Sequence, residues 1–328
     1  MHVLVTGGAG YIGSISVRSL LDAGHSVTVL DTLERGHREA VDARARLVVG
    51  DVGAREACLS ALEGCSGVLH CAGYIDVAES MREPELYMLA NAVRPATLLG
   101  AMAETGISSF VFSSTAAVYG EPQWLPITED HALEPVNWYG RSKLAFEGLL
   151  DTNGRDLGLR SVRFRYFNAA GAWPDGSLGE AHDPETHIVP RVLAVAAAGG
   201  GEFEIFGEDY RTRDGTCVRD YVHVMDLAAA HLLALEALEG SLEGGTFNLG
   251  NGQGYTNREV VRECAQVTGV RIAETVGPRR EGDPAKLLAS AELARTVLGW
   301  TPRYGALSEM IAHAWAWHSA HPEGYRSA

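Results

Sequence analysis

The chain has 328 residues, 46% hydrophobic and 21% charged, a balance typical of a globular protein with a sizeable core. This composition excludes fibrous, collagen-like and disordered proteins, and no apolar run is long enough for a membrane span. The 42 Asp and Glu residues outnumber the 27 Lys and Arg residues and leave a formal net charge of −15, which gives no long-range attraction for polyanions. We therefore expect no nucleic-acid or membrane partner, although local arginines and backbone amides still allow a small phosphorylated ligand.

The cysteines and the first residues indicate the compartment. The five cysteines are odd in number and show neither CxxC nor His-paired metal spacing, so we expect reduced thiols and no resident metal. Met1–Thr6 runs directly into Gly7 without the basic and apolar regions of a secretion signal, and we interpret it as a first strand. These features predict a cytoplasmic protein.

In the first half of the chain, short β-branched runs alternate with stretches that carry apolar residues at helical spacing. The expected strands are Val3–Val5, Ser26–Leu30, Arg46–Val49, Gly67–Cys71, Phe110–Ser113 and Ser161–Tyr166. The expected helices are Tyr11–Ala23, Arg55–Leu62, Leu86–Glu104 and Tyr139–Asp156. This alternation predicts the α/β class, with a Rossmann-type, doubly wound parallel sheet.

After Asn168 the sequence changes to loops rich in Gly, Pro and acidic residues, such as Ala172–Pro184 and Gly207–Thr216. Short helices are expected at Val260–Val267 and Ser290–Leu298, and a terminal helix at Leu307–His318. We predict two domains, a dinucleotide-binding domain over residues 1–168 and a smaller α/β substrate domain over residues 169–328. The chain may return to the first domain within the second range.

A glycine-rich motif, Gly8-Ala9-Gly10-Tyr11-Ile12-Gly13, follows the first expected strand and opens the first expected helix. Gly7 gives the same segment a GxxGxxG spacing. Glycines permit a tight turn and bring a pyrophosphate close to the helix N-terminus, where free amides and the helix dipole favour anions. The motif therefore predicts a dinucleotide site.

Two aspartates follow the next strands. Asp31 lies eighteen residues beyond Gly13, where a carboxylate accepts hydrogen bonds from both hydroxyls of an adenosine ribose. It would repel a 2′-phosphate, so the cofactor is expected to be NAD, with NADP a minor alternative because Arg35 is near. Asp51, in Gly50-Asp51-Val52, either binds adenine or caps the helix that starts near Arg55.

Tyr139-Gly140-Arg141-Ser142-Lys143 places a phenol and an ammonium group four residues apart, on one face of one helix. A tyrosine base has a free pKa of about 10, and lowering it by three or four units requires roughly 4 to 5 kcal/mol. A neighbouring lysine and a cationic nicotinamide can supply this energy. The hydroxyl of Thr115, at the end of an expected strand, can share the substrate proton.

Together these motifs resemble the UDP-galactose (UDP-glucose) 4-epimerase family of the extended short-chain dehydrogenase/reductase superfamily, over nearly the whole chain. The matching stretches are Thr6–Ser14, Ser113–Gly120, Tyr139–Lys143, Arg165–Ala172, Asp214–Val224, Asn248–Gly250 and Arg279–Pro284. The resemblance implies a homodimeric enzyme of galactose metabolism that interconverts UDP-galactose and UDP-glucose. The reaction would be a transient oxidation at sugar C4 with bound NAD.

The resemblance also implies roles for individual residues. Tyr139 would deprotonate the sugar O4, Thr115 would bridge O4 to this base, and Lys143 would hold the nicotinamide ribose. Cofactor contacts fall on Gly7, Gly10, Tyr11, Ile12, Gly13, Asp31, Asp51, Val52, Cys71, Ala72, Gly73 and Tyr166. Substrate contacts fall on Asn168, His187, Glu204, Phe206, Arg219, Tyr221, Arg280, Asp283 and Leu287.

Within the substrate set, Arg219 and Arg280 would clamp the diphosphate and Asp283 would accept from the uridine ribose. Asn168 would bind the nucleotide sugar, and Glu204–Phe206 resembles the family strand beside uracil. Leu287 would face the substituent at sugar C2. His187 is equally consistent with a hydrogen-bonded structural histidine.

One segment departs from the family pattern. Ile75, followed by Asp76, stands where the family commonly has a lysine for the cofactor phosphates. The next helix carries Pro95, which should kink or shorten its first turns. We therefore expect a weakened grip on the cofactor.

Other functions remain open at this point. One is another NAD-dependent NDP-sugar epimerase or ketoreductase, for example a UDP-N-acetylhexosamine 4-epimerase. Dehydratase and decarboxylase chemistry needs an acid just after Thr115, and Ala116 cannot serve. Another alternative is a non-catalytic sugar-nucleotide sensor, which the altered cofactor segment suggests. The presence of Thr115, Tyr139 and Lys143 argues against it, because a sensor would not require them.

Overall fold

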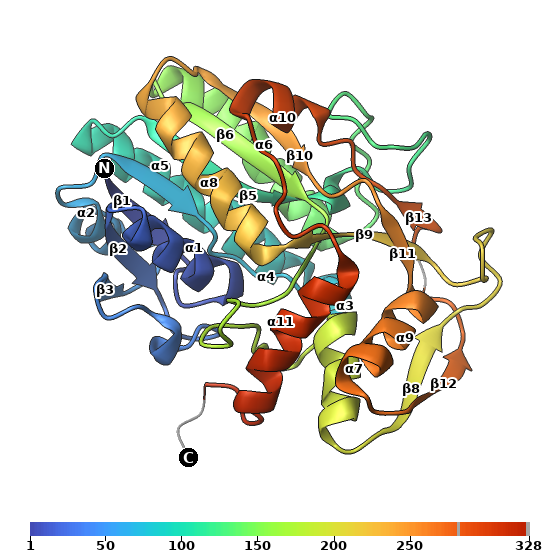
Figure 1. Cartoon of the computed structure of the whole chain (residues 1–328). Coiled ribbons are helices and arrows are strands. Elements are labelled where there is room, and N and C mark those ends of the chain that lie inside the picture. Colours follow the sequence, from blue (N-terminus) through green and yellow to red (C-terminus); the bar gives the residue numbers. More distant parts are fainter. Residues whose placement is uncertain (281–282, 326–328) are drawn as a thin grey trace.

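The computed structural model describes residues 1–280 and 283–325, and a seven-stranded parallel sheet forms its larger part (Figure 1). The strand order is β10-β6-β5-β4-β1-β2-β3. These strands are β1 (His2–Thr6), β2 (Ser26–Asp31), β3 (Arg46–Val49), β4 (Gly67–His70), β5 (Ser109–Thr115), β6 (Arg160–Tyr166) and β10 (Gly244–Leu249). The order reverses between β1 and β4, which is the switch point of a doubly wound sheet.

Helices cover both faces of this sheet. One face is covered by α1 (Tyr11–Asp22) and α8 (Val224–Glu239), and the other by α2 (Arg55–Leu62), α5 (Arg94–Thr105) and α6 (Trp138–Asp156). Val3 and Val5 pack in the first core and Leu4 in the second, because successive strand residues point to opposite faces. The expected α/β class and doubly wound sheet are thus confirmed.

The predicted elements of the first half are present, with their ends shifted by one or two residues. The helix expected at Leu86–Glu104 consists of α4 (Pro84–Met88), a π-helical turn η2 (Leu89–Val93) and α5. Pro95 lacks an N–H group and its ring crowds the carbonyl four residues earlier, which explains the widened turn directly before it. The expected disturbance therefore takes the form of a π-turn. Helix α3 (Val77–Arg82) was not predicted.

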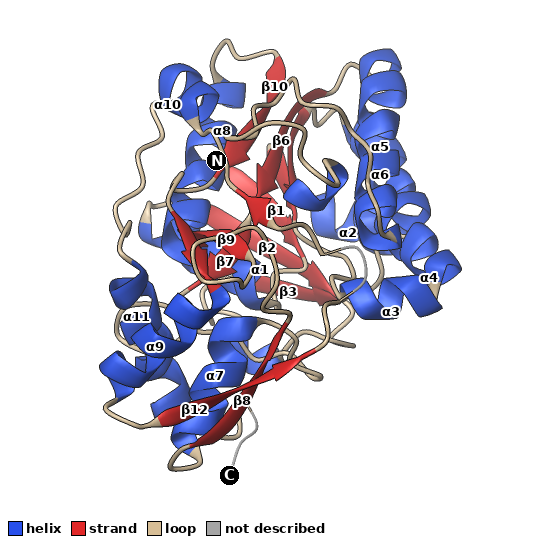
Figure 2. Ribbon diagram, turned by 90° about the vertical axis from the view of Figure 1, so that its right-hand side faces the viewer, coloured by secondary structure: helices blue, strands red, loops and turns tan. Residues whose placement is uncertain are grey.

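A smaller α/β region lies below the large sheet in Figure 2. It contains the parallel pair β8 (Gly201–Phe206) and β12 (Ile272–Gly277), and a second sheet around β9. That sheet comprises β7 (Asn168–Ala170), β9 (Val218–His223), β11 (Gly254–Thr256) and β13 (Lys286–Leu287). The helices of the region are α7 (Ile188–Ala197), α9 (Asn257–Thr268) and α11 (Leu307–Ala320), which share one core with β8 and β9.

The chain after Asn168 contributes to both parts. β10 pairs with β6 in the large sheet, α8 packs against α1, and α10 (Glu292–Leu298) packs against β10 and α8. The short 3₁₀ helices η1 (Arg38–Ala40) and η3 (Ala116–Val118) complete the structure. The functional division at residue 168 stays a prediction.

Among the described residues, no helix combines the length and apolar character needed to cross a bilayer. All five cysteines are free thiols. Burial raises the pKa of Cys71 to about 11, so this thiol stays protonated at neutral pH.

Candidate functional site

A cleft of about 1430 Å³ opens at the carboxyl ends of the large sheet's strands and extends to the smaller region. It lies at the switch point, where open α/β sheets bind their ligands. The predicted site residues that line it are Gly7, Gly10, Tyr11, Ile12, Gly13, Asp31, Asp51, Val52, Cys71, Ala72, Gly73, Thr115, Tyr139, Lys143, Tyr166, Asn168, His187, Arg219, Arg280, Asp283 and Leu287. The other three, Glu204, Phe206 and Tyr221, line an adjoining cavity of about 170 Å³.

The glycine turn after β1 has no room for side chains. Gly7 has φ of +70°, and a Cβ there would lie 2.5 Å from the backbone nitrogen of Ala72. A Cβ on Gly13 would lie 2.1 Å from the carbonyl oxygen of Gly7. Gly10 is the N-cap of α1 and provides no side-chain cap. The first amides of α1 are therefore available to an anion in the cleft.

Asp31 ends β2 at the edge of the cleft. Its carboxylate accepts hydrogen bonds from Ala9 N at 3.0 Å and Leu33 N at 2.8 Å, one on each oxygen. Each oxygen retains a lone pair for a ribose hydroxyl. The guanidinium group of Arg35 donates to Glu79 at 2.8 and 3.0 Å and lies over the Tyr74 ring at 3.9 Å. Because Arg35 is already engaged, the cleft favours a free ribose 2′-hydroxyl over a 2′-phosphate.

Asp51 lies on the same wall but does not cap α2. Its carboxylate accepts from Gly53 N at 2.6 Å and from Arg94 at 2.9 Å. The N-cap of α2 is Ala54, which forms no side-chain cap. The capping alternative is therefore wrong, because the chain turns at Gly53 before the helix begins. The contact with adenine stays a prediction.

Thr115 and Tyr139 meet at the centre of the cleft. Thr115 is the last residue of β5, and Tyr139 lies in the first turn of α6. The helix approaches closely because Gly140 has no side chain: a Cβ there would lie 2.5 Å from the carbonyl oxygen of Ala117. Burial raises the pKa of Tyr139, and a side-chain hydrogen bond with Thr115 opposes this effect. The protein alone therefore leaves the phenol protonated at neutral pH.

Lys143 lies one turn further along α6 and is buried. Its Nζ donates to the carbonyl oxygen of Ser113 at 3.0 Å and lies 5.0 Å from the Phe112 ring. Burial lowers its pKa to about 8, even though Glu147 favours the charged form. The carboxylate of Glu147 forms a buried ion pair with Arg165 and accepts from Ser114 Oγ at 2.5 Å. Lys143 therefore carries a poorly solvated charge that faces the cleft.

Arg219 and Arg280 reach the cleft from the smaller region. Arg219 on β9 forms an ion pair with Asp283 and donates to the carbonyl oxygen of Val218 at 2.7 Å. The guanidinium group of Arg280 lies 4.2 Å from the centre of the Phe206 ring. Both arginines thus line one stretch of cleft wall, next to an aromatic ring. Asp283 is bound to Arg219, so a ribose hydroxyl would have to share its carboxylate.

The remaining predicted substrate residues lie on neighbouring strands. Asn168 on β7 pairs in register with Tyr221 on β9. Glu204 on β8 lies against Gly277 of β12, where a Cβ would approach its Oε1 to 2.6 Å. Leu287 on β13 pairs with β9 and packs on a small apolar cluster, so it lines the cleft as a half-buried side chain.

Asn91, to which the sequence had suggested no role, connects the cofactor wall to α6. Its amide accepts from Tyr74 N at 2.8 Å and donates to Tyr74 O and Ser142 Oγ at 3.0 Å each. Asn91 lies 1% exposed in the π-turn, so it fixes the loop that follows β4.

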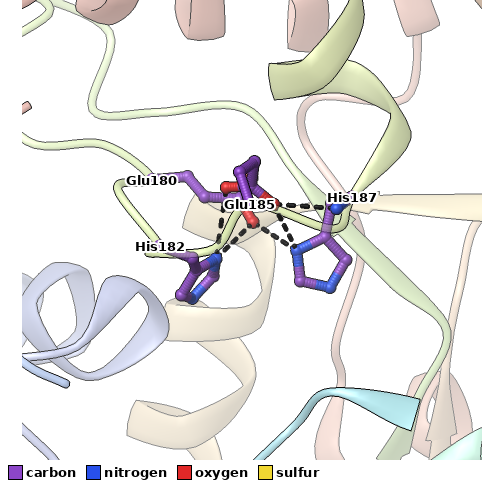
Figure 3. Close-up of side chains that lie close together, drawn as sticks. All are labelled: Glu180, His182, Glu185 and His187. Atoms are coloured by element: carbon purple, nitrogen blue, oxygen red, sulfur yellow. Dashed lines mark hydrogen bonds and ion pairs between the residues drawn. The ribbon is translucent and has the colours of Figure 1, made fainter. Parts of the chain in front are cut away.

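A second feature was also missed, a cluster on the loop between β7 and α7 (Figure 3). The Glu-His cluster consists of Glu180, His182, Glu185 and His187. Burial disfavours protonation of its histidines, but the two carboxylates outweigh this effect and raise the pKa of His182 to about 9 and that of His187 to about 10. The signal in the sequence was the repeated Glu-x-His at 180–182 and 185–187.

The fold and the cleft define a class of protein. A doubly wound sheet with a glycine turn, an aspartate after β2 and a Tyr–Lys pair at its carboxyl edge is the arrangement of dinucleotide-dependent enzymes of the short-chain dehydrogenase/reductase type. The chain belongs to the NAD dependent epimerase/dehydratase family, whose profile matches residues 3–250.

Individual relatives are similar over the whole chain. The UDP-glucose 4-epimerase of Lacticaseibacillus casei is 50% identical over 327 residues, which cover 99% of either chain. A solved UDP-glucose 4-epimerase from Brucella ovis in complex with NAD is 41% identical, with a TM-score of 0.93 over 98% of both chains. A further structure, from Bifidobacterium longum in complex with NAD⁺ and UDP, is 34% identical, with a TM-score of 0.93 over 99% of this chain and 100% of that one. The expected family is confirmed.

Proposed function

We infer that this protein is a UDP-hexose 4-epimerase that interconverts UDP-galactose and UDP-glucose with NAD as its cofactor. The observation that carries this conclusion is the single cleft: it joins the glycine turn, the pair of Thr115 and Tyr139, and the two arginines of the smaller region. Relatives of this name match the chain over its full length. An acid/base pair between a dinucleotide site and an anion site is what redox chemistry on a nucleotide sugar requires.

The residues present fit NAD. The turn packs too tightly for a Cβ at Gly7 or Gly13, and α1 begins directly after it, so that the first amides of this helix can bind a pyrophosphate in the cleft. Asp31 has free lone pairs for a ribose, and Lys143 faces the opposite end of the cofactor wall. When bound, NAD would take a hydride from sugar C4 and return it to the other face.

The proton chemistry falls to Thr115 and Tyr139. Thr115 is placed to pass the O4 proton to the phenolate of Tyr139, which later gives it back to the reduced sugar. Since burial raises the Tyr139 pKa, cationic groups beside the phenol have to stabilise the phenolate. Lys143 would contribute one positive charge and a bound nicotinamide the second.

The substrate grip divides between the two parts of the molecule. Arg219 and Arg280 would hold the diphosphate on the smaller region, while the sugar would lie over Tyr139 on the larger one. Tight binding of the nucleotide and loose binding of the sugar would let the oxidised sugar present either face to the cofactor. The proposed division at residue 168 separates these two tasks.

We propose that the protein acts as a homodimer in the cytoplasm. Four apolar side chains on α3 and η2 are strongly exposed: Val77 at 46%, Met81 at 55%, Leu89 at 42% and Val93 at 58%. Exposed apolar side chains on these elements favour burial against a second copy through the helices around Leu86 and Tyr139. The free thiols fit a reducing compartment.

The test is to incubate purified protein with UDP-galactose or UDP-N-acetylgalactosamine, with and without added NAD, and to separate the products. We expect UDP-glucose from UDP-galactose, without net consumption of NAD. Accumulation of NADH or of a 4-keto sugar would indicate a partial reaction. Nucleotide binding without turnover would indicate a sensor.

A further inference from the structure

We propose that the Glu-His cluster is a binding site for one divalent transition-metal ion of the zinc type. The cluster lies on the loop that leads from β7 to α7 and forms part of the cleft wall. This proposal departs from the sequence-based expectation that the protein holds no metal. It is independent of the proposed epimerase activity.

The ligand atoms already converge. His182 Nδ1 lies 3.1 Å from Glu180 Oε1 and 3.4 Å from Glu185 Oε2. His187 Nδ1 lies 2.7 Å from Glu180 Oε1 and 3.3 Å from Glu185 Oε1. One donor atom from each of the four residues fits within a span of 4.8 Å. Ligands bound at about 2.0–2.2 Å to a tetrahedral ion lie about 3.3–3.6 Å apart, so little movement is needed.

The chemistry of the donors selects the metal. Two imidazole nitrogens and two carboxylate oxygens suit Zn²⁺, whereas Mg²⁺ and Ca²⁺ prefer oxygen ligands alone. With neutral imidazoles the cluster has a charge of −2, which one divalent ion balances. In the competing, ion-paired state, both imidazoles are protonated and positively charged, and they form ion pairs with Glu180 and Glu185 without a metal.

The surrounding structure holds the ligands in place. The Glu180 side chain is 6% exposed, and its carbonyl oxygen accepts from Trp317 Nε1 of α11 at 3.0 Å. His187 is the N-cap of α7, and its backbone N–H donates to Glu185 Oε1 at 2.8 Å. The ring of Tyr11, in α1, meets that of His182 edge-on at 6.3 Å. Both large and small regions therefore support the cluster.

The site would be structural. Four protein ligands complete a tetrahedral shell and leave no open position for substrate or water, as in structural zinc sites. The bound ion would tie the two Glu-x-His segments together and hold this part of the cleft wall in place. Only Nδ1 of His187 is used, which is compatible with the predicted substrate contact through its other nitrogen.

The test is to treat the full-length protein with a chelator, exchange the buffer, and titrate it with zinc in an isothermal calorimeter, with metal analysis of the product. We expect one equivalent of zinc to bind per chain. His182→Gln and Glu185→Gln should each weaken zinc binding at least tenfold, because each removes one ligand. The matched control is His25→Gln, since His25 lies 3.9 Å from the carboxylate of Glu236 and 3.3 Å from the amino group of Met1, and outside the Glu-His cluster.

Thermal unfolding provides a second readout that does not depend on activity. Zinc should raise the melting temperature of the parent and of the His25→Gln protein, but not that of the two cluster variants. Two outcomes would overturn the proposal: a parent that binds no zinc, or cluster variants that bind it as tightly as the parent. Either result would show that the cluster is in the ion-paired state, with both histidines protonated and no metal bound.

Discussion

Replacing Lys143 by methionine should stabilise the fold at neutral pH while it removes the proposed activity. The lysine is 3% exposed, and burial lowers its pKa from 10.5 to about 8. This difference corresponds to about 3 kcal/mol of cost for keeping the side chain charged in the folded state. Methionine has a similar length and no charge to desolvate.

The gain is partly offset. Lys143 Nζ donates a hydrogen bond of 3.0 Å to the carbonyl oxygen of Ser113, and losing it should cost about 1 kcal/mol. We therefore expect Lys143→Met to gain about 2 kcal/mol at pH 7. The unfolded chain binds more protons than the folded chain between about pH 8 and 10.5, so the stability of the parent rises over that window and the advantage of the variant disappears.

The assay is urea unfolding of the parent and variant without added NAD, at pH 7 and at pH 10. Lys286→Met, at the other lysine of the sequence, is the control for removing an ammonium group. The reasoning fails if Lys143→Met is less stable than the parent at pH 7. It also fails if the difference between the two proteins is the same at both pH values.

The remaining predictions concern the cleft. Tyr139→Phe should lower turnover at least a hundredfold, which is a typical contribution of acid/base catalysis, while the Kd for UDP stays near that of the parent. A tenfold weaker binding of UDP would show instead that the phenol acts in binding. Ile75→Lys should tighten NAD binding about tenfold in calorimetry, because it adds a cation at the cleft wall. The control is Leu293→Lys at an exposed position on α10, which should leave the Kd for NAD unchanged. The parent should prefer UDP-galactose and turn over UDP-N-acetylgalactosamine poorly, since Leu287 leaves an acetamide short of partners, a cost of roughly 1 to 3 kcal/mol. Leu287→Ser should raise the relative rate on the N-acetyl sugar and Leu287→Tyr should abolish it, and a ratio of rates that responds to neither substitution would place the boundary of the pocket elsewhere.

Features determined by local spacing were predictable from the sequence. The glycine turn follows β1 directly, and Tyr139 and Lys143 share a face of α6 because helical residues four apart do so in any fold. The central strands β1, β4 and β5 of the large sheet are buried on both faces, so they form short apolar runs with recognisable ends. A disturbance at Pro95 was expected from the geometry of proline as a kink or a shortened helix, and the structure has a π-turn there instead.

Elements with weak periodicity were missed. Helix α8 packs against the sheet and against its neighbours α1 and α10, so most of its surface is apolar and it shows little helical stripe. The return of β10 to the edge of the large sheet was foreseen only as a possibility, because strand order depends on crossovers and not on local sequence. Strand β13 is only two residues long, too short to show any alternation.

By itself, the sequence determined the α/β class, the place of the cofactor turn and the composition of the acid/base pair, since each depends on neighbours along the chain. Only the tertiary structure decided which charges meet. Arg35 pairs with Glu79, and Arg219 with Asp283, across gaps of 44 and 64 residues. It also decided that Asp51 leaves α2 uncapped and that Lys143 is desolvated. The physical reason is that ion pairing and burial depend on distances in space, which the spacing of residues along a chain does not specify.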